Sequence, residues 1–144
     1  MMGTTDALVN LISDIRSKIS FERIIDVGSG SGGPMIDTVQ SINANADIKI
    51  DLLLTDLYPN QQLVKEINKR GIPNVSYSER PLDATQLDEA PEGLKTMIAS
   101  FHHMPLSQAR RILSTAQSSG QPILIYEVAQ NNICLLYTSD AADD

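Results

Sequence analysis

The segment with the clearest chemical signal spans residues 26–33 and reads DVGSGSGG, between a short β-branched run and a predicted helix. Glycine has no Cβ, so it allows positive φ in a tight turn and lets a ligand lie against backbone amides. Four glycines and two serines at a strand-to-helix junction therefore predict a ligand-binding loop rather than a plain turn. We expect Gly28, Ser29, Gly30 and Gly32 to line it.

Two cofactor classes compete for this loop. Gly28, Gly30 and Gly33 satisfy the G-x-G-x-x-G pattern of dinucleotide-binding proteins. The chain also resembles the class I (Rossmann-like) S-adenosylmethionine-dependent methyltransferases, whose first motif is an acidic residue, one spacer and three glycines at alternate positions; Asp26, Gly28, Gly30 and Gly32 fit it. A carboxylate there suits a cofactor with an ammonium group and would repel two phosphates. The resemblance implies that Asp26 helps to hold the methionine part of this cofactor.

Two further acids follow predicted strands. Asp56 ends the second strand, where a carboxylate can accept hydrogen bonds from both ribose hydroxyls, and Leu57 and Tyr58 could pack on adenine. Both cofactor classes require such an acid, and a cap on the next helix is the alternative role for Asp56. Asp83 and Ala84 follow the third strand. The resemblance implies that the Asp83 carboxylate accepts a hydrogen bond from the adenine amino group, with Ala84 beside it in the cofactor site. An Asx-turn is the alternative role for Asp83.

Residues 100–105 (SFHHMP) follow the fourth predicted strand, where many small-molecule methyltransferases of this class carry a similar run. His102 or His103 could act as a general base, because the unperturbed pKa of histidine is about 6.5. Methyl transfer often needs little proton chemistry, so the two histidines could instead only shape the pocket. We expect Ser100 to contact the cofactor. No third ligand accompanies the histidines, so we predict no metal site.

The elements that must position these residues alternate along the chain. Apolar residues at helical spacing predict a helix over residues 8–19, after a capping cluster at 4–6, and further helices from Pro34, over 59–70 and over 105–119. Short apolar runs predict strands at 23–27, 50–55, 75–78, 94–99 and 123–128. Such alternation predicts an α/β fold with a doubly wound parallel sheet that binds its ligand at the carboxyl ends of the strands.

The resemblance covers about residues 6–129, and the usual sheet of the family has two further strands that are missing here. Residues 133–144 look like translated adapter sequence. We therefore predict a partial S-adenosylmethionine-binding core over residues 1–132 with about five strands, followed by a non-native or disordered tail over 133–144. An unprotected fifth strand would favour aggregation and make catalysis by this chain doubtful.

Composition narrows the class of protein. The 144 residues, 42% hydrophobic and 20% charged, are typical of one globular domain. A net charge of -7 disfavours nucleic acid as a partner, and no window reaches the roughly 18 apolar residues of a membrane span. There is no signal-peptide pattern, and Cys134 is the single cysteine. We expect a cytoplasmic protein with a small-molecule substrate.

The leading functional prediction is S-adenosylmethionine-dependent methyl transfer to a small-molecule acceptor. One alternative is an NAD(P)-dependent oxidoreductase, in which the loop amides would contact a pyrophosphate. The other is a non-catalytic module that holds the cofactor without turnover.

Overall fold

A parallel sheet forms the centre of the computed structural model, which describes residues 3–98 and 104–127. Its five strands lie in the order β3-β2-β1-β4-β5, and every neighbouring pair is parallel. The strands are β1 (Arg23–Asp26), β2 (Asp51–Leu54), β3 (Val75–Tyr77), β4 (Leu94–Ile98) and β5 (Ile123–Tyr126). All five were predicted within two residues, and the prediction of a parallel α/β sheet is confirmed.

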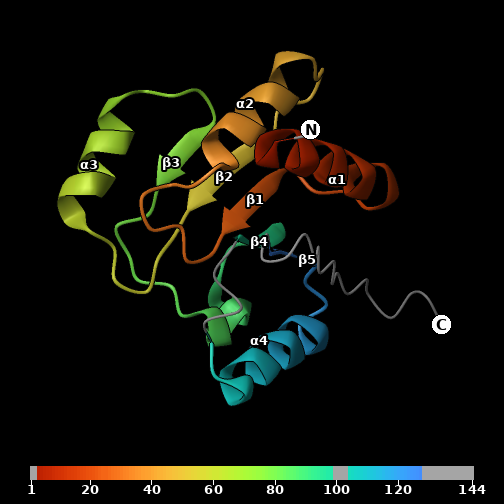
Figure 1. Cartoon of the computed structure of the whole chain (residues 1–144), viewed down its shortest axis with the longest axis vertical. Coiled ribbons are helices and arrows are strands. Elements are labelled where there is room, and N and C mark those ends of the chain that lie inside the picture. The colour runs from red at the N-terminus through yellow and green to blue at the C-terminus, as the bar shows by residue number, and fades with distance from the viewer. Residues whose placement is uncertain (1–2, 99–103, 128–144) are drawn as a thin grey trace.

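Helices cover both faces of this sheet (Figure 1). They are α1 (Thr4–Lys18), α2 (Met35–Ala44), α3 (Gln61–Lys69), the 3-10 helix η1 (Ala84–Glu89) and α4 (Leu106–Ser118). Helices α1, α2 and α3 pack on one face, and η1 and α4 pack on the other. The fold is therefore doubly wound, as the alternation of apolar runs predicted.

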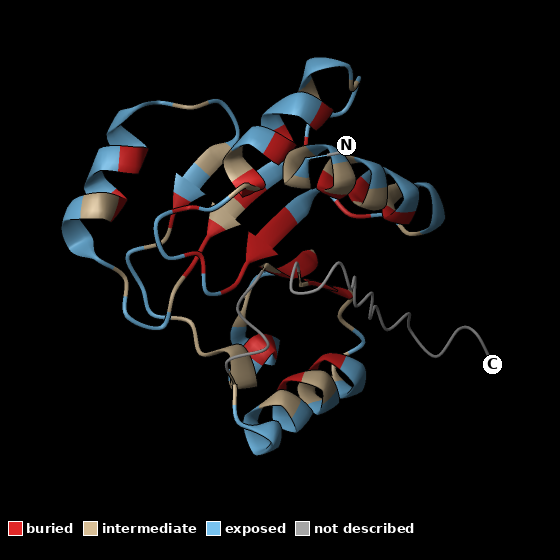
Figure 2. Cartoon of the chain, viewed as in Figure 1, coloured by how far each residue is buried: buried red, intermediate tan, exposed pale blue. Residues whose placement is uncertain are grey.

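Two apolar cores result, one on each face of the sheet, and Figure 2 shows the buried residues gathered along the strands and the inward sides of the helices. Consecutive residues of β1 serve different cores, because side chains alternate across a strand. Ile24 joins the larger core with Leu8 of α1 and Met35 of α2. Ile25 joins the smaller core, which η1 and α4 cover. This two-sided burial explains why the strands are almost continuously apolar.

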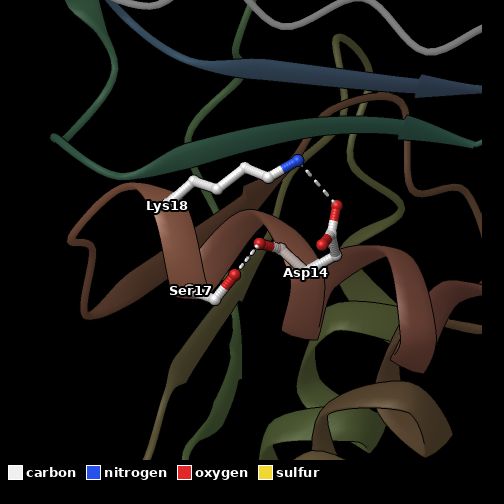
Figure 3. Close-up of polar contacts among 3 residues, drawn as sticks. All are labelled: Asp14, Ser17 and Lys18. Atoms are coloured by element: carbon white, nitrogen blue, oxygen red, sulfur yellow. Dashed lines mark hydrogen bonds and ion pairs between the residues drawn. The ribbon is translucent and has the colours of Figure 1, made fainter.

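Helix α1 begins differently from the prediction. Thr4 is already helical, and Gly3 is the N-cap without a side-chain hydrogen bond, so the residues 4–6 do not form the expected cap. On the exposed side of α1, the Ser17 hydroxyl donates to the Asp14 carbonyl oxygen at 2.6 Å, and Lys18 Nζ lies 3.2 Å from the Asp14 carboxylate (Figure 3). Exposed ion pairs of this kind contribute little to stability.

The segment 83–93, predicted as turn-rich, contains η1, and this short helix packs against α4. Thr115 Oγ1 of α4 donates to the Thr85 carbonyl oxygen at 3.3 Å. Within residues 3–98 and 104–127, no helix is long and apolar enough to cross a membrane.

Candidate functional site

The loop between β1 and α2 has the backbone shape that its glycines predict. Gly28, Gly30, Gly32 and Gly33 have φ values of 70°, 54°, 111° and 55°, a region that other residues adopt at a cost. A Cβ added to Gly30 or Gly33 would meet no atom within 4 Å. Packing against the described residues therefore does not explain these two glycines, and no described atom fills the space beside them.

Part of the hydrogen-bonding capacity of this loop is unused. Ser29 N donates to the Thr55 carbonyl oxygen, and Gly32 N donates to the Ser29 carbonyl oxygen, both at 2.8 Å. The amides of Gly30 and Ser31 have no acceptor among the residues that the structure describes. These donors lie just before α2, where the helix dipole also favours a negative group. A carboxylate or a phosphate of a ligand could accept from them.

Asp26, the last residue of β1, is 3% exposed, and both of its carboxylate oxygens have partners. Thr96 Oγ1 of β4 donates to Oδ1 at 2.6 Å, and Ser29 Oγ donates to Oδ2 at 2.7 Å. Burial raises the pKa of Asp26 to about 6; the two hydroxyls oppose that change, and the charge of Asp56 adds to it. A charge placed near Asp26 would therefore change the fraction of this carboxyl group that is ionised near neutral pH.

Hydroxyl groups that come from β4 or from the ends of β2 and β3 hold Asp26 and the loop after it, and sequence reasoning missed them. Thr55 Oγ1, just after β2, donates to the Asp26 carbonyl oxygen at 2.7 Å. The Tyr77 hydroxyl, at the end of β3, donates to the Gly30 carbonyl oxygen at 2.6 Å. With Thr96 of β4, these contacts connect the loop to three other strands. The only signal in the sequence is that each hydroxyl lies within or just after an apolar strand.

Asp56 lies close to this loop and does not cap the next helix. Its Oδ1 accepts from Leu57 N at 2.9 Å, whereas the N-cap of α3 is Asn60, whose side chain accepts from Leu63 N. The charge of Asp56 contributes to the raised pKa values of Asp26 and Tyr77. The Asp56 carboxylate is therefore close enough to both side chains to affect their ionisation. Leu57 is 40% exposed and can contact a ligand. The capping alternative for Asp56 is therefore wrong.

Asp83 forms the Asx-turn that was its alternative role. Its Oδ1 accepts from Thr85 N at 2.8 Å and from Thr85 Oγ1 at 2.7 Å, and these bonds lower its pKa. The residue before it, Leu82, donates its amide to the Asp56 carbonyl oxygen at 3.0 Å. The segment leading to Asp83 therefore lies against the end of β2, and Ala84 packs against the smaller core.

Ser100, His102 and His103 lie outside the described residues. In the part of the chain that the structure does describe, no group of three or more His, Cys, Asp or Glu side chains could hold a metal ion.

Several solved methyltransferase structures resemble this chain. An O-methyltransferase family protein from Burkholderia thailandensis is 19% identical with a TM-score of 0.54, over 84% of this chain and 39% of its own. A putative sarcosine dimethylglycine methyltransferase from Galdieria sulphuraria is 14% identical with a TM-score of 0.60, over 86% and 46%. The trans-methyltransferase CalH in complex with SAH is 20% identical with a TM-score of 0.56, over 82% and 34%.

The chain therefore spans less than half the length of these proteins. No protein-family model and no curated protein sequence matches it. At these identities the likeness concerns the fold. Together with the strand order 3-2-1-4-5, it shows a Rossmann-like α/β fold similar to that of these methyltransferase structures.

Proposed function

We propose that this chain is the S-adenosylmethionine-binding part of a methyltransferase that acts on a small molecule. The observation that carries the proposal is the buried Asp26 carboxylate directly before a loop of positive-φ glycines, with open space beside Gly30 and Gly33. The similar structure of CalH holds SAH, the product form of this cofactor.

The charges around the loop fit the methionine part of the cofactor. The amides of Gly30 and Ser31, which have no acceptor among the described residues, can donate to its carboxylate. The buried negative charge of Asp26 favours its ammonium group. A dinucleotide would instead bring two phosphates to the same loop, where Asp26 and Asp56 both raise the energy of a further negative charge. The acids therefore favour the sulfonium cofactor over NAD(P).

The nucleoside part has its own candidate residues. Asp56 can accept from the ribose hydroxyls, since among the described residues its carboxylate accepts only from Leu57 N, through Oδ1. The exposed Leu57 can pack on adenine, and Ala84 can contact the ring beside it. Both bonds from Thr85 end on Oδ1 of Asp83, so the Asx-turn leaves Oδ2 to accept from the adenine amino group. The Asx-turn and the adenine contact are thus compatible.

The cofactor supplies an electrophilic methyl group on a sulfonium, so binding and alignment are the main tasks of the protein. Ser100 is proposed to contact the cofactor. His102 and His103 are proposed as a general base or as walls of the acceptor site.

Calorimetric titration with S-adenosylhomocysteine and with NAD tests the choice of cofactor. We expect saturable heat with S-adenosylhomocysteine and none with NAD. Asp56→Asn should weaken the binding about tenfold, because a charge-assisted hydrogen bond is lost. Asp14→Asn on the exposed side of α1 makes the same chemical change away from the site and should leave the affinity unchanged. Heat with NAD alone would favour the oxidoreductase.

Methyl transfer itself is measured separately. Radiolabelled S-adenosylmethionine is mixed with the chain and the low-molecular-mass fraction of a cell extract, and label should move into a small molecule. Tight binding without any transfer would instead support the non-catalytic module.

A further inference from the structure

The last residue of β3 is a tyrosine whose hydroxyl reaches across to the glycine loop. The Tyr77 side chain is 3% exposed, and its hydroxyl donates to the Gly30 carbonyl oxygen, 47 residues earlier in the chain, at 2.6 Å. Burial, together with the charges of Asp56 and Asp26, raises the pKa of Tyr77 to about 12. The phenol therefore keeps its proton at neutral pH and remains a donor.

This bond has a direct effect on the next amide. The peptide bond between Gly30 and Ser31 is trans, so its carbonyl and its N–H point in opposite directions. A bond that fixes the Gly30 carbonyl therefore also fixes the direction of Ser31 N, which has no acceptor among the described residues. Gly30 has a φ of 54° and no neighbour within 4 Å of its Cβ position, so side-chain packing does not hold it.

We propose that Tyr77 is a positioning residue of the cofactor site, which holds the Gly30–Ser31 peptide so that the Ser31 amide is presented to the ligand. This inference rests on the proposed function for the identity of the ligand. It differs from the role of Asp26, because Tyr77 acts through the backbone and leaves the charge of the site unchanged.

Two matched substitutions separate this role from general stability. Tyr77→Phe keeps the buried ring and removes only the hydroxyl. Tyr126→Phe makes the same change at the last residue of β5, where the side chain is 6% exposed and the hydroxyl has no hydrogen bond within the described part of the chain. Both variants should fold, because each conserves the apolar volume of the core.

Affinities for S-adenosylhomocysteine and for adenosine give the first readout. Tyr77→Phe should raise the Kd for S-adenosylhomocysteine about 3- to 10-fold, which corresponds to one lost hydrogen bond. It should leave the Kd for adenosine unchanged, because adenosine lacks the amino-acid part that the loop would hold. Tyr126→Phe should change neither. An equal loss for both ligands, or no loss for either, would overturn the positioning role.

A ligand-free measurement keeps this inference separate from the cofactor assignment. The Gly32 amide donates to the Ser29 carbonyl oxygen inside the loop, so its hydrogen exchange reports how well the loop is held. Tyr77→Phe should speed this exchange about 3- to 10-fold, whereas Tyr126→Phe should not. If the unchanged chain binds neither ligand, the proposed function fails, and the Gly32 exchange rate alone decides the role of Tyr77. An unchanged rate refutes it.

Discussion

The two ends of the parallel strands each bury one charged side chain, Asp26 at the carboxyl end and Lys95 at the amino end. The two side chains differ in their hydrogen-bond partners. At the carboxyl end, two hydroxyls donate to Asp26. At the amino end, Lys95 of β4 is 0% exposed, and its ammonium donates to the carbonyl oxygens of Pro91 and Gly93 and to Gln121 Oε1. The three N–H groups of Lys95 thus meet three acceptors. Burial lowers the pKa of Lys95 to about 8, and the charge of Glu92 opposes that change.

Two glycines, Gly93 at the amino end and Gly30 at the carboxyl end, have different surroundings. A Cβ on Gly93 would collide with the Arg23 carbonyl oxygen, so this glycine is explained by the close approach of β1 and β4. A Cβ on Gly30 would meet no described atom within 4 Å, and it lies next to amides that have no acceptor in the described ranges. A buried charge is therefore a poor marker of function in this fold. Within the described ranges, what marks the end with the candidate ligand site is a run of positive-φ glycines with two backbone amides that have no acceptor.

The largest expected effect is that of Gly93→Ala at the amino end. The added methyl group would overlap backbone atoms of Arg23, and φ at this position is 143°, so β1 and β4 would have to separate. We expect the free energy of unfolding to fall by about 3 kcal/mol or more in urea denaturation. Gly120→Ala, also at positive φ but with no neighbour within 4 Å, is the control and should lose about 1 kcal/mol. Equal losses would contradict the steric explanation.

Lys95→Met should come next. The substitution keeps most of the aliphatic chain but leaves the Pro91 and Gly93 carbonyl oxygens without this donor. Because buried unsatisfied acceptors are costly, we expect the free energy of unfolding to fall by about 2 kcal/mol. The affinity for S-adenosylhomocysteine should not change in calorimetry. A large loss of affinity would show that the amino end also shapes the ligand site.

Asp26→Asn should act mainly on binding. Without the negative charge, the affinity for S-adenosylhomocysteine should fall about tenfold at pH 7.5, or about 1.4 kcal/mol. In the unchanged chain the ligand ammonium favours ionised Asp26, whose pKa is about 6 when free. Affinity should therefore rise from pH 5 to pH 7.5, with proton release on binding. The Asn variant should bind with the same affinity at both pH values.

The free energy of unfolding should fall with rising pH, whereas the ligand affinity should rise. Measuring it tests whether burial is the cause of the raised pKa of Asp26. The pKa of Asp26 is about 6 in the folded chain, against 3.8 for an ordinary aspartate, so the folded state holds the proton more tightly. The contribution of Asp26 to the free energy of unfolding is fully present below about pH 4 and is lost as the pH rises through 6. Relative to Asp26→Asn, the unchanged chain should lose about 1.4 kcal/mol per unit of pKa difference over this range. A gain would show that hydrogen bonds, not burial, dominate.

The smallest expected effect on stability is that of Gly30→Ala. The methyl group meets no atom, so only the positive φ of 54° opposes it, and the loss should be about 1 kcal/mol. The same methyl group would enter the proposed ligand space, so the affinity for S-adenosylhomocysteine should fall more than tenfold. A variant that binds normally would mean that the ligand does not lie beside Gly30.

Local patterns predicted much of this molecule. The glycine loop, Asp26 and Asp56 could be predicted as candidate site residues because strand, turn and acid are adjacent in sequence. Thr55, Tyr77 and Thr96 were missed because their contacts depend on strand register, which sequence spacing does not give. Lys95 left a usable signal, a single cation inside an apolar strand. The division into a core over residues 1–132 and a tail over 133–144 stays a prediction.

The hydroxyl contacts of the glycine loop also constrain the order of folding. Thr96 and Asp26 are 70 residues apart, and Tyr77 and Gly30 are 47 apart, so both bonds require distant segments to have met. Contacts between such distant segments form slowly, since the entropy of closing long loops must first be overcome. The loop should therefore reach its final shape only after β2, β3 and β4 have assembled around β1. A ligand that recognises this loop would bind only the assembled sheet, and would slow its unfolding as a unit.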